Sequence, residues 1–149
     1  MTTQTTSISY VPSATLRPPI RRALGGSAVA AVAGAVVLFG YGAIAIAIHG
    51  PMNVGSPGDP TPITAVSFSI GVLFSSFFGI LLAVALARWA TRPATTFERA
   101  GIALTVVSLW APLTAQTDES TRLFLAVGHV VGACVVIPLI MRSLRTRLV

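Results

Sequence analysis

Few side chains in the apolar stretches of this chain could do chemistry, and the imidazole of His129 is foremost among them. Tyr41 and Cys134 are the other ionisable residues well inside an apolar stretch, and both side chains are ordinarily neutral at pH 7. Ionisable groups inside a membrane are functional candidates by default. A buried imidazole can bridge two helices as a neutral group, bind a proton or small ligand, or ligate a metal or haem. These interpretations stay open, and the neutral bridge is favoured.

The rest of the composition argues against catalysis and bound cofactors. A zinc site needs several ligands, and His49, the other histidine, stands at the boundary of an apolar stretch. A single cysteine excludes an intramolecular disulfide and CxxC chemistry. No carboxylate lies inside an apolar stretch, and no spacing ties serine, histidine and aspartate together. We therefore expect a protein that is not an enzyme and that holds no cofactor or metal.

The elements that must position His129 are four long apolar stretches. The chain has 149 residues, of which 54% are hydrophobic and 9% are charged, whereas a soluble domain has about 25% charged residues. The bilayer is therefore the expected solvent, and segments that cross it must be helical because lipid offers the backbone no hydrogen-bond partners. We predict an all-α fold, an integral membrane four-helix transmembrane bundle. Residues 21–149 form this domain, with helices at about 23–48, 63–87, 98–116 and 121–142.

The arginines predict how the bundle is oriented. Three precede the first apolar stretch, three separate the second from the third, and three follow the fourth. They are Arg17, Arg21, Arg22, Arg88, Arg92, Arg99, Arg142, Arg145 and Arg147. Only Arg122 falls on the other side, beside Asp118 and Glu119. By the positive-inside rule both termini are cytoplasmic, and residues 1–20, rich in Ser, Thr and Pro, are expected to be a disordered cytoplasmic tail.

The same distribution bears on location and partners. A net charge of +6 that is divided among helix ends suits lipid headgroups and not nucleic acid, which needs one continuous basic surface. Arginine without lysine, in a chain rich in Ala, Val and Gly, indicates a GC-rich bacterial genome. We expect a multi-pass protein of the bacterial inner membrane. A cleavable signal peptide is the alternative for the first stretch, but that stretch is too long for a signal core.

The outer connection at 49–62 is rich in Gly and Pro and cannot continue either flanking helix. We expect a linker there, and the alternative is a flap over the outer end of the bundle.

Small residues at intervals of four predict where helices approach one another, because close packing replaces the hydrophobic effect in lipid. The second stretch carries a ladder of six such residues, and the fourth carries the pair Gly128 and Gly132. The ladder consists of Ser67, Gly71, Ser75, Gly79, Ala83 and Ala87. Each step of four overshoots a helical turn by about 40°. The outer rungs (67–75) and the inner rungs (79–87) should therefore face different neighbours, one of which could be another subunit.

Depth places several polar groups in one layer. His129 lies seven residues from Arg122, roughly 10 Å below the outer boundary at 1.5 Å per residue, and Tyr41 and Ser67 also belong to the outer half. Pro112 has no N–H, so the carbonyl of Ser108 loses its helical donor. We predict that His129 donates a hydrogen bond to the carbonyl or hydroxyl of Ser108, directly or through water, with Tyr41 as a further member of the layer.

The third and fourth stretches carry a resemblance. Residues 108–113 (Ser-Leu-Trp-Ala-Pro-Leu), together with His129, Gly132, Ile137 and Pro138, resemble an uncharacterised family of small four-helix membrane proteins of actinobacteria, a domain of unknown function. The resemblance covers the chain from the first apolar stretch to the final arginines. It implies the fold and a bacterial membrane, and it implies no catalytic residue.

Three functional hypotheses follow from these patterns. The first is a non-enzymatic accessory or partner-binding subunit, whose partners are the lipid bilayer and another membrane protein or a second copy of the chain. The second is a small transporter or a binder of lipophilic ligands, with an outer-half cavity around Tyr41, Ser67, Ser108 and His129. The third is a membrane enzyme or electron carrier.

Overall fold

The computed structural model describes residues 18–145, so the predicted tail lies almost entirely outside the described residues, as do Arg17 and Arg147. Helix α1 (Pro18–His49) is followed by strands β1 (Met52–Val54) and β2 (Thr61–Ile63) and by helix α2 (Ala65–Trp89). Helices α3 (Pro93–Ser108), α4 (Trp110–Thr114) and α5 (Glu119–Leu144) complete the chain. Within the described part, α1, α2 and α5 are long and apolar enough to cross a membrane.

The third predicted helix differs most from expectation. It begins at Pro93, before the predicted residue 98, and is divided into α3 and the short α4 at Leu109. Pro112 lies four residues after Ser108 and cannot donate to its carbonyl, which explains a break at this place. The N–H of Leu109 still donates to the carbonyl of Thr105. The fold is thus helical as predicted, but the third predicted helix is interrupted, and its longer part, α3, is shorter than the other three long helices.

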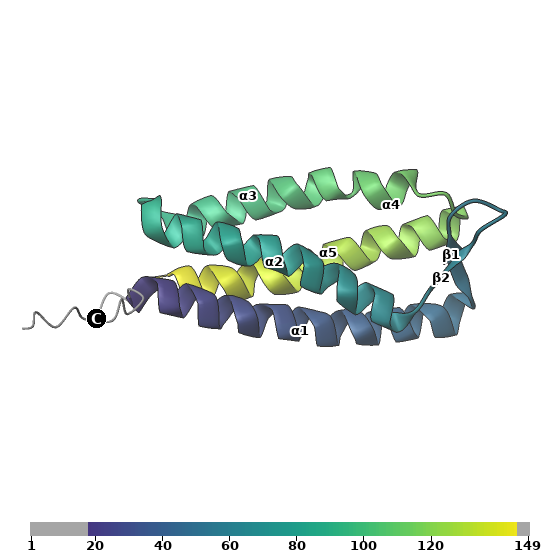
Figure 1. Cartoon of the computed structure of the whole chain (residues 1–149), viewed down its shortest axis with the longest axis horizontal. Coiled ribbons are helices and arrows are strands. Elements are labelled where there is room, and N and C mark those ends of the chain that lie inside the picture. Colours follow the sequence, from purple (N-terminus) through teal and green to yellow (C-terminus); the bar gives the residue numbers. More distant parts are fainter. Residues whose placement is uncertain (1–17, 146–149) are drawn as a thin grey trace, which may run out of the picture.

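Helix α1 holds the bundle together. It makes its most extensive contacts with α2 and α5, whereas α3 contacts α5 and touches α2 less. In Figure 1, α1 and the α3–α4 pair lie on opposite sides, with α2 and α5 between them. The start of α1 meets the end of α5, where the space beside Gly26 is filled by Ser143. The seven described arginines that were predicted to share a side do share this end, which we call the arginine end.

Close approach through α1 depends on residues that have little or no side chain. Ala23 and Ala30 are fully buried. A Cβ atom added at Gly34 would lie 2.7 Å from Cγ2 of Val136 on α5. A Cβ atom added at Gly42 would lie 2.6 Å from Cδ2 of Phe68 and 3.0 Å from the backbone Cα of Ala65 on α2. Small residues on α1 therefore set the spacing to both of its neighbours.

The outer connection is ordered, so the prediction of a simple linker is wrong. Strands β1 and β2 pair antiparallel, with Met52 opposite Ile63. Met52 is 1% exposed and belongs with Ile63 to an apolar cluster that also contains Leu38 and Phe68. The backbone N–H of Gly55, at φ +117°, donates to the carbonyl of Gln116 at 2.9 Å. The hairpin therefore covers the other end of the bundle, which we call the hairpin end.

Two glycines on α1 form a matched pair for testing this packing. Gly42→Ala should lower the free energy of unfolding by about 1–3 kcal/mol, because an added methyl group overpacks a filled interface. Gly40→Ala should cost nothing, since a Cβ there meets no atom within 4 Å and alanine favours a helix. Unfolding of the two variants in mixed detergent micelles measures the difference. Equal stabilities would contradict this account of the α1–α2 interface.

Candidate functional site

The bundle contains a cleft of about 530 Å³ that is bounded by α2, α3 and α5. It runs from Val54 and Ile63 at the hairpin end to Phe97 and Ile140 towards the arginine end. Helix α1 draws α2 and α5 towards itself, while α3 makes fewer contacts with either of them. The cleft thus lies where α3 makes few contacts with α2.

Three of the four residues predicted for the buried polar layer line this cleft. They are Ser67 from α2, Ser108 from α3 and His129 from α5. Tyr41 lies elsewhere: its hydroxyl donates to the carbonyl of Phe124 at 2.8 Å and so joins α1 to α5. These three residues are exposed and line one long cleft, so the structure does not gather them into a buried layer at one depth, and Tyr41 faces a different interface.

The predicted hydrogen bond between His129 and Ser108 is not made. Nδ1 of His129 lies 3.0 Å from the carbonyl oxygen of Leu125, one turn earlier in α5. The hydroxyl of Ser108 donates to the carbonyl of Thr105 at 2.8 Å. Both groups find partners in their own helices, so neither has to reach across the cleft.

The ladder on α2 divides only roughly as its rotation predicts, because the inner rung Gly79 lines the cleft together with the outer rungs. Ser67, Gly71 and Ser75 are exposed and line the cleft, whereas Ala83 is fully buried in the core. The prediction that Gly71 packs against another helix is wrong within this chain, because a Cβ added there would meet no atom within 4 Å. A Cβ at Gly79 would make an ordinary contact with Ile140 at 3.6 Å. The outer rungs face open space and not another helix.

The glycine pair on α5, Gly128 and Gly132, lies where α5 contacts α1 and α2. A Cβ added at Gly128 would lie 3.2 Å from ring carbons of both Phe68 and Tyr41. One added at Gly132 would lie 3.5 Å from Val72 and 3.6 Å from Leu38. These glycines let α5 approach α1 and α2, and they form one edge of the cleft.

Ser76 is a cleft residue that the sequence patterns did not indicate. It is 2% exposed, and its hydroxyl has no hydrogen-bond partner among the described residues. Such groups are uncommon, because buried polar atoms nearly always find a partner. The sequence feature that could have indicated Ser76 is its position directly after the ladder residue Ser75.

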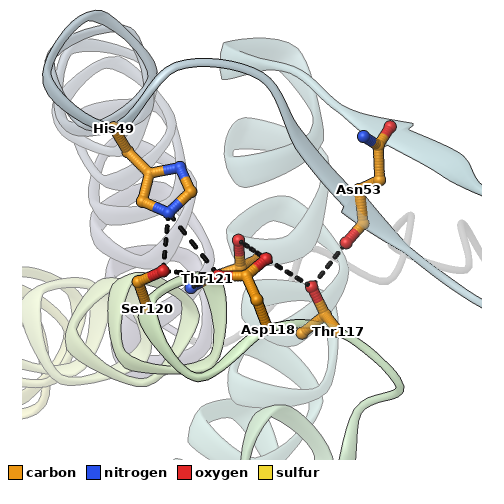
Figure 2. A network of polar contacts seen from close by, with 6 residues as sticks. All are labelled: His49, Asn53, Thr117, Asp118, Ser120 and Thr121. Carbon is orange, nitrogen blue, oxygen red and sulfur yellow. Dashed lines mark hydrogen bonds and ion pairs between the residues drawn. The ribbon is translucent and has the colours of Figure 1, made fainter.

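A second polar cluster lies at the hairpin end (Figure 2). Asp118 caps α5 by accepting hydrogen bonds from the N–H and the hydroxyl of Thr121, each at 2.8 Å. Nε2 of His49, the last residue of α1, lies 2.7 Å from the hydroxyl of Ser120 and 3.5 Å from Asp118. The hydroxyl of Thr117 donates to the carbonyl of Asn53 in β1. The cluster thus joins α1, the hairpin and α5.

The types of Ser120, His49 and Asp118 match a hydrolytic triad, but their arrangement does not. In a triad the serine and the aspartate occupy opposite ring nitrogens of the histidine. Here both approach Nε2, and Nδ1 of His49 has no partner among the described residues. Ser120 donates directly to Asp118. This arrangement suits a structural clip between elements.

Hydrogen bonds also change the acidity of the clip. Donation from the hydroxyl of Ser120, then from the backbone and the hydroxyl of Thr121, holds the pKa of Asp118 well below its usual range. The carboxylate is therefore charged wherever the fold is intact at ordinary pH.

Comparison with known proteins gives a family. Residues 18–146 match the family described as "Family of unknown function (DUF6069)". The chain belongs to this family. The DUF6069 match extends from the start of α1 beyond the end of α5, so it includes both the cleft and the polar clip. No curated protein and no solved structure matches the chain.

The clip predicts a dependence of stability on pH. A carboxyl whose pKa is lower in the folded than in the unfolded protein adds stability above its unfolded value of about 3.9, and that stability is lost as the pH falls towards the folded value. The unfolding temperature of the wild type should therefore drop as the pH is lowered below about 4. Asp118→Asn, which keeps an N-cap residue but has no charge to lose, should show a shallower drop.

The neighbouring Glu119→Gln substitution is the matched control, because the side chain of Glu119 is exposed and makes no hydrogen bond to a described residue. It should retain the wild-type pH profile. Parallel profiles for the wild type and Asp118→Asn would show that the clip contributes no charge-dependent stability.

Proposed function

We propose that this protein is a non-enzymatic integral membrane protein whose cleft binds a lipophilic molecule taken from the bilayer. The cleft itself is the observation that supports the proposal. Its volume of about 530 Å³ lies within the roughly 300–1,000 Å³ of ligand pockets, which are mostly apolar and carry a few polar groups. The polar side chains here come from Ser67, Ser75, Ser76, Thr105, Ser108 and His129.

A partner helix is the competing occupant, as the hypothesis of an accessory subunit requires. Small residues such as Gly71 and Ser75 favour helix docking. However, Phe74 and Phe78 also line the cleft and pack edge to face, with ring centroids 5.2 Å apart. Bulky rings beside the ladder occupy space that a second backbone would need for close approach. We therefore favour a small flexible ligand over a helix.

We also propose a location and an orientation. The protein would reside in the inner membrane of a bacterium, an actinobacterium as the resemblance implies, with both termini in the cytoplasm. Support comes from the arginine end, where the starts and ends of the helices bring seven described arginines together. Cytoplasmic ends of membrane helices carry this excess of positive charge.

Reporter fusions test the orientation. Green fluorescent protein fused after Val149 should fluoresce, and alkaline phosphatase at the same position should be inactive, because the first folds in the cytoplasm and the second outside it. Phosphatase inserted into the hairpin between Ser56 and Pro57 should be active. The opposite pattern of activities would refute the proposed orientation.

Filling the cleft tests the binding function. Gly71→Leu should fit without a clash, because open space surrounds residue 71, but its side chain would occupy the cleft. Photolabelling with a hexadecyl diazirine in lipid nanodiscs, followed by peptide mass spectrometry, should mark α2 and α3 of the wild type. Labelling at these positions should fall roughly tenfold in Gly71→Leu, the change expected when binding loses about 1.4 kcal/mol.

Gly40→Leu is the matched control. It adds the same side chain to α1 where nothing lies within 4 Å, and residue 40 is not part of the cleft, so labelling of α2 and α3 should persist. Uniform labelling of all lipid-facing surfaces, unchanged by Gly71→Leu, would contradict a binding cleft. Protection of α2 and α3 from the label by a co-purifying protein or a second copy of the chain would support the partner-helix alternative instead.

A further inference from the structure

The orientation of the His129 ring determines which hydrogen bonds the cleft can offer. A carbonyl oxygen can only accept, so Nδ1 of His129 must be the donor in its contact with Leu125. In a neutral imidazole the other nitrogen then carries no proton and accepts hydrogen bonds. Nε2 makes no hydrogen bond to any described residue, and His129 lines the cleft. Nε2 of this exposed cleft-lining residue is therefore a free acceptor for a ligand.

Ser76 is an independent sign of a ligand site. Its buried hydroxyl also lacks a partner among the described residues, and Ser76 lines the same cleft. Ser76 lies twelve residues after Thr64, the N-cap of α2, and so roughly 18 Å from the hairpin end at 1.5 Å per residue. His129 lies eleven residues after Asp118, the N-cap of α5, and so roughly 16 Å from that end by the same measure. Two polar groups without a partner among the described residues thus lie at similar depth on one largely apolar cleft.

The cleft offers nothing to a charged group. No arginine, aspartate or glutamate is among its lining residues, and an ion moved into apolar surroundings without a partner is strongly disfavoured. Beyond Ser76 on α2, Thr105 on α3 and His129 on α5, the lining towards the arginine end is apolar, with Leu104, Ile137 and Ile140. From His129 to Ile140 this part extends roughly 16 Å along α5, which is enough for an alkyl chain.

We infer that the cleft binds an uncharged lipid with a free hydroxyl group. The hydroxyl donates to Nε2 of His129, and the apolar tail lies between α2 and α3 towards the arginine end. The inference rests on the proposed function of the cleft, and it adds the chemical class of the ligand. Fatty-acid anions and zwitterionic phospholipid headgroups are excluded from the site by their charge.

Three probes with the same tail separate the two proposals: hexadecan-1-ol, its methyl ether and palmitate. Thermal stability of the purified full chain reports binding. The ¹⁵N NMR signal of Nε2 reports the hydrogen bond, and it can be assigned readily because the chain has only two histidines. The signals that vanish in His129→Leu belong to His129. The Gly71→Leu and Gly40→Leu variants control for binding outside the cleft.

The alcohol and the ether should both stabilise the wild type through their tails, and only the alcohol should shift the Nε2 signal. In His129→Leu the affinity for the alcohol should fall roughly tenfold, to that of the ether, since one hydrogen bond is lost. Equal binding of alcohol and ether with an unmoved Nε2 signal would overturn the inference and leave the proposed function standing. Palmitate binding as tightly as the alcohol would also overturn it. No stabilisation by any probe would overturn both.

Discussion

Close approach of α1 to two other helices is the constraint on which the rest of the structure depends. Gly34 and Gly42 leave no room for a side chain, and Ala23 and Ala30 are fully buried between neighbours. In lipid, where apolar surface gains nothing by leaving the solvent, such close packing supplies much of the affinity between helices. Because α2 and α5 are both drawn to α1, α3 is left with fewer contacts, and the cleft lies along its inner face.

Two polar groups that line the cleft bond within their own helices. His129 uses the carbonyl of Leu125, and Ser108 uses that of Thr105. Local bonds of this kind need no neighbouring helix, so they leave the width of the cleft to be set by packing. Longer-range polar contacts join α1 to its neighbours through Tyr41 and Ser69, which donate to the carbonyls of Phe124 and Ala35. Others gather at the hairpin end, where Asp118 and His49 join the ends of α5 and α1. One end of the bundle is thus clipped by polar contacts, while its middle retains open space.

Much of this fold could be predicted from the sequence, because charge and hydropathy act locally. Apolar length predicts the three long helices, arginine positions predict which ends meet, and Pro112 predicts a disturbance near Ser108. The hairpin could not be predicted from its Gly- and Pro-rich composition. Its pairing of Met52 with Ile63 depends on two helix ends that packing brings together.

The candidate site was predictable only in part, for a related reason. Ser67, Ser108 and His129 all line the cleft, but depth along each helix carries no information about the distance between helices. The predicted bond across α3 and α5 therefore failed, and Gly71, assigned to packing, faces open space. Rotation along the ladder predicted a change of surroundings. The outer rungs face a cleft because α1 packs on α2 and α5. A local sequence pattern does not contain that information.

Native mass spectrometry of the protein released directly from its own membranes tests the central claim most directly. A cleft that holds a lipophilic molecule predicts a chain that carries one tightly held neutral lipid in addition to its own mass, and fragmentation would identify that lipid. A bare chain under conditions that keep known lipid-binding proteins loaded would contradict the account. So would a stoichiometric complex with another protein that leaves no bound lipid.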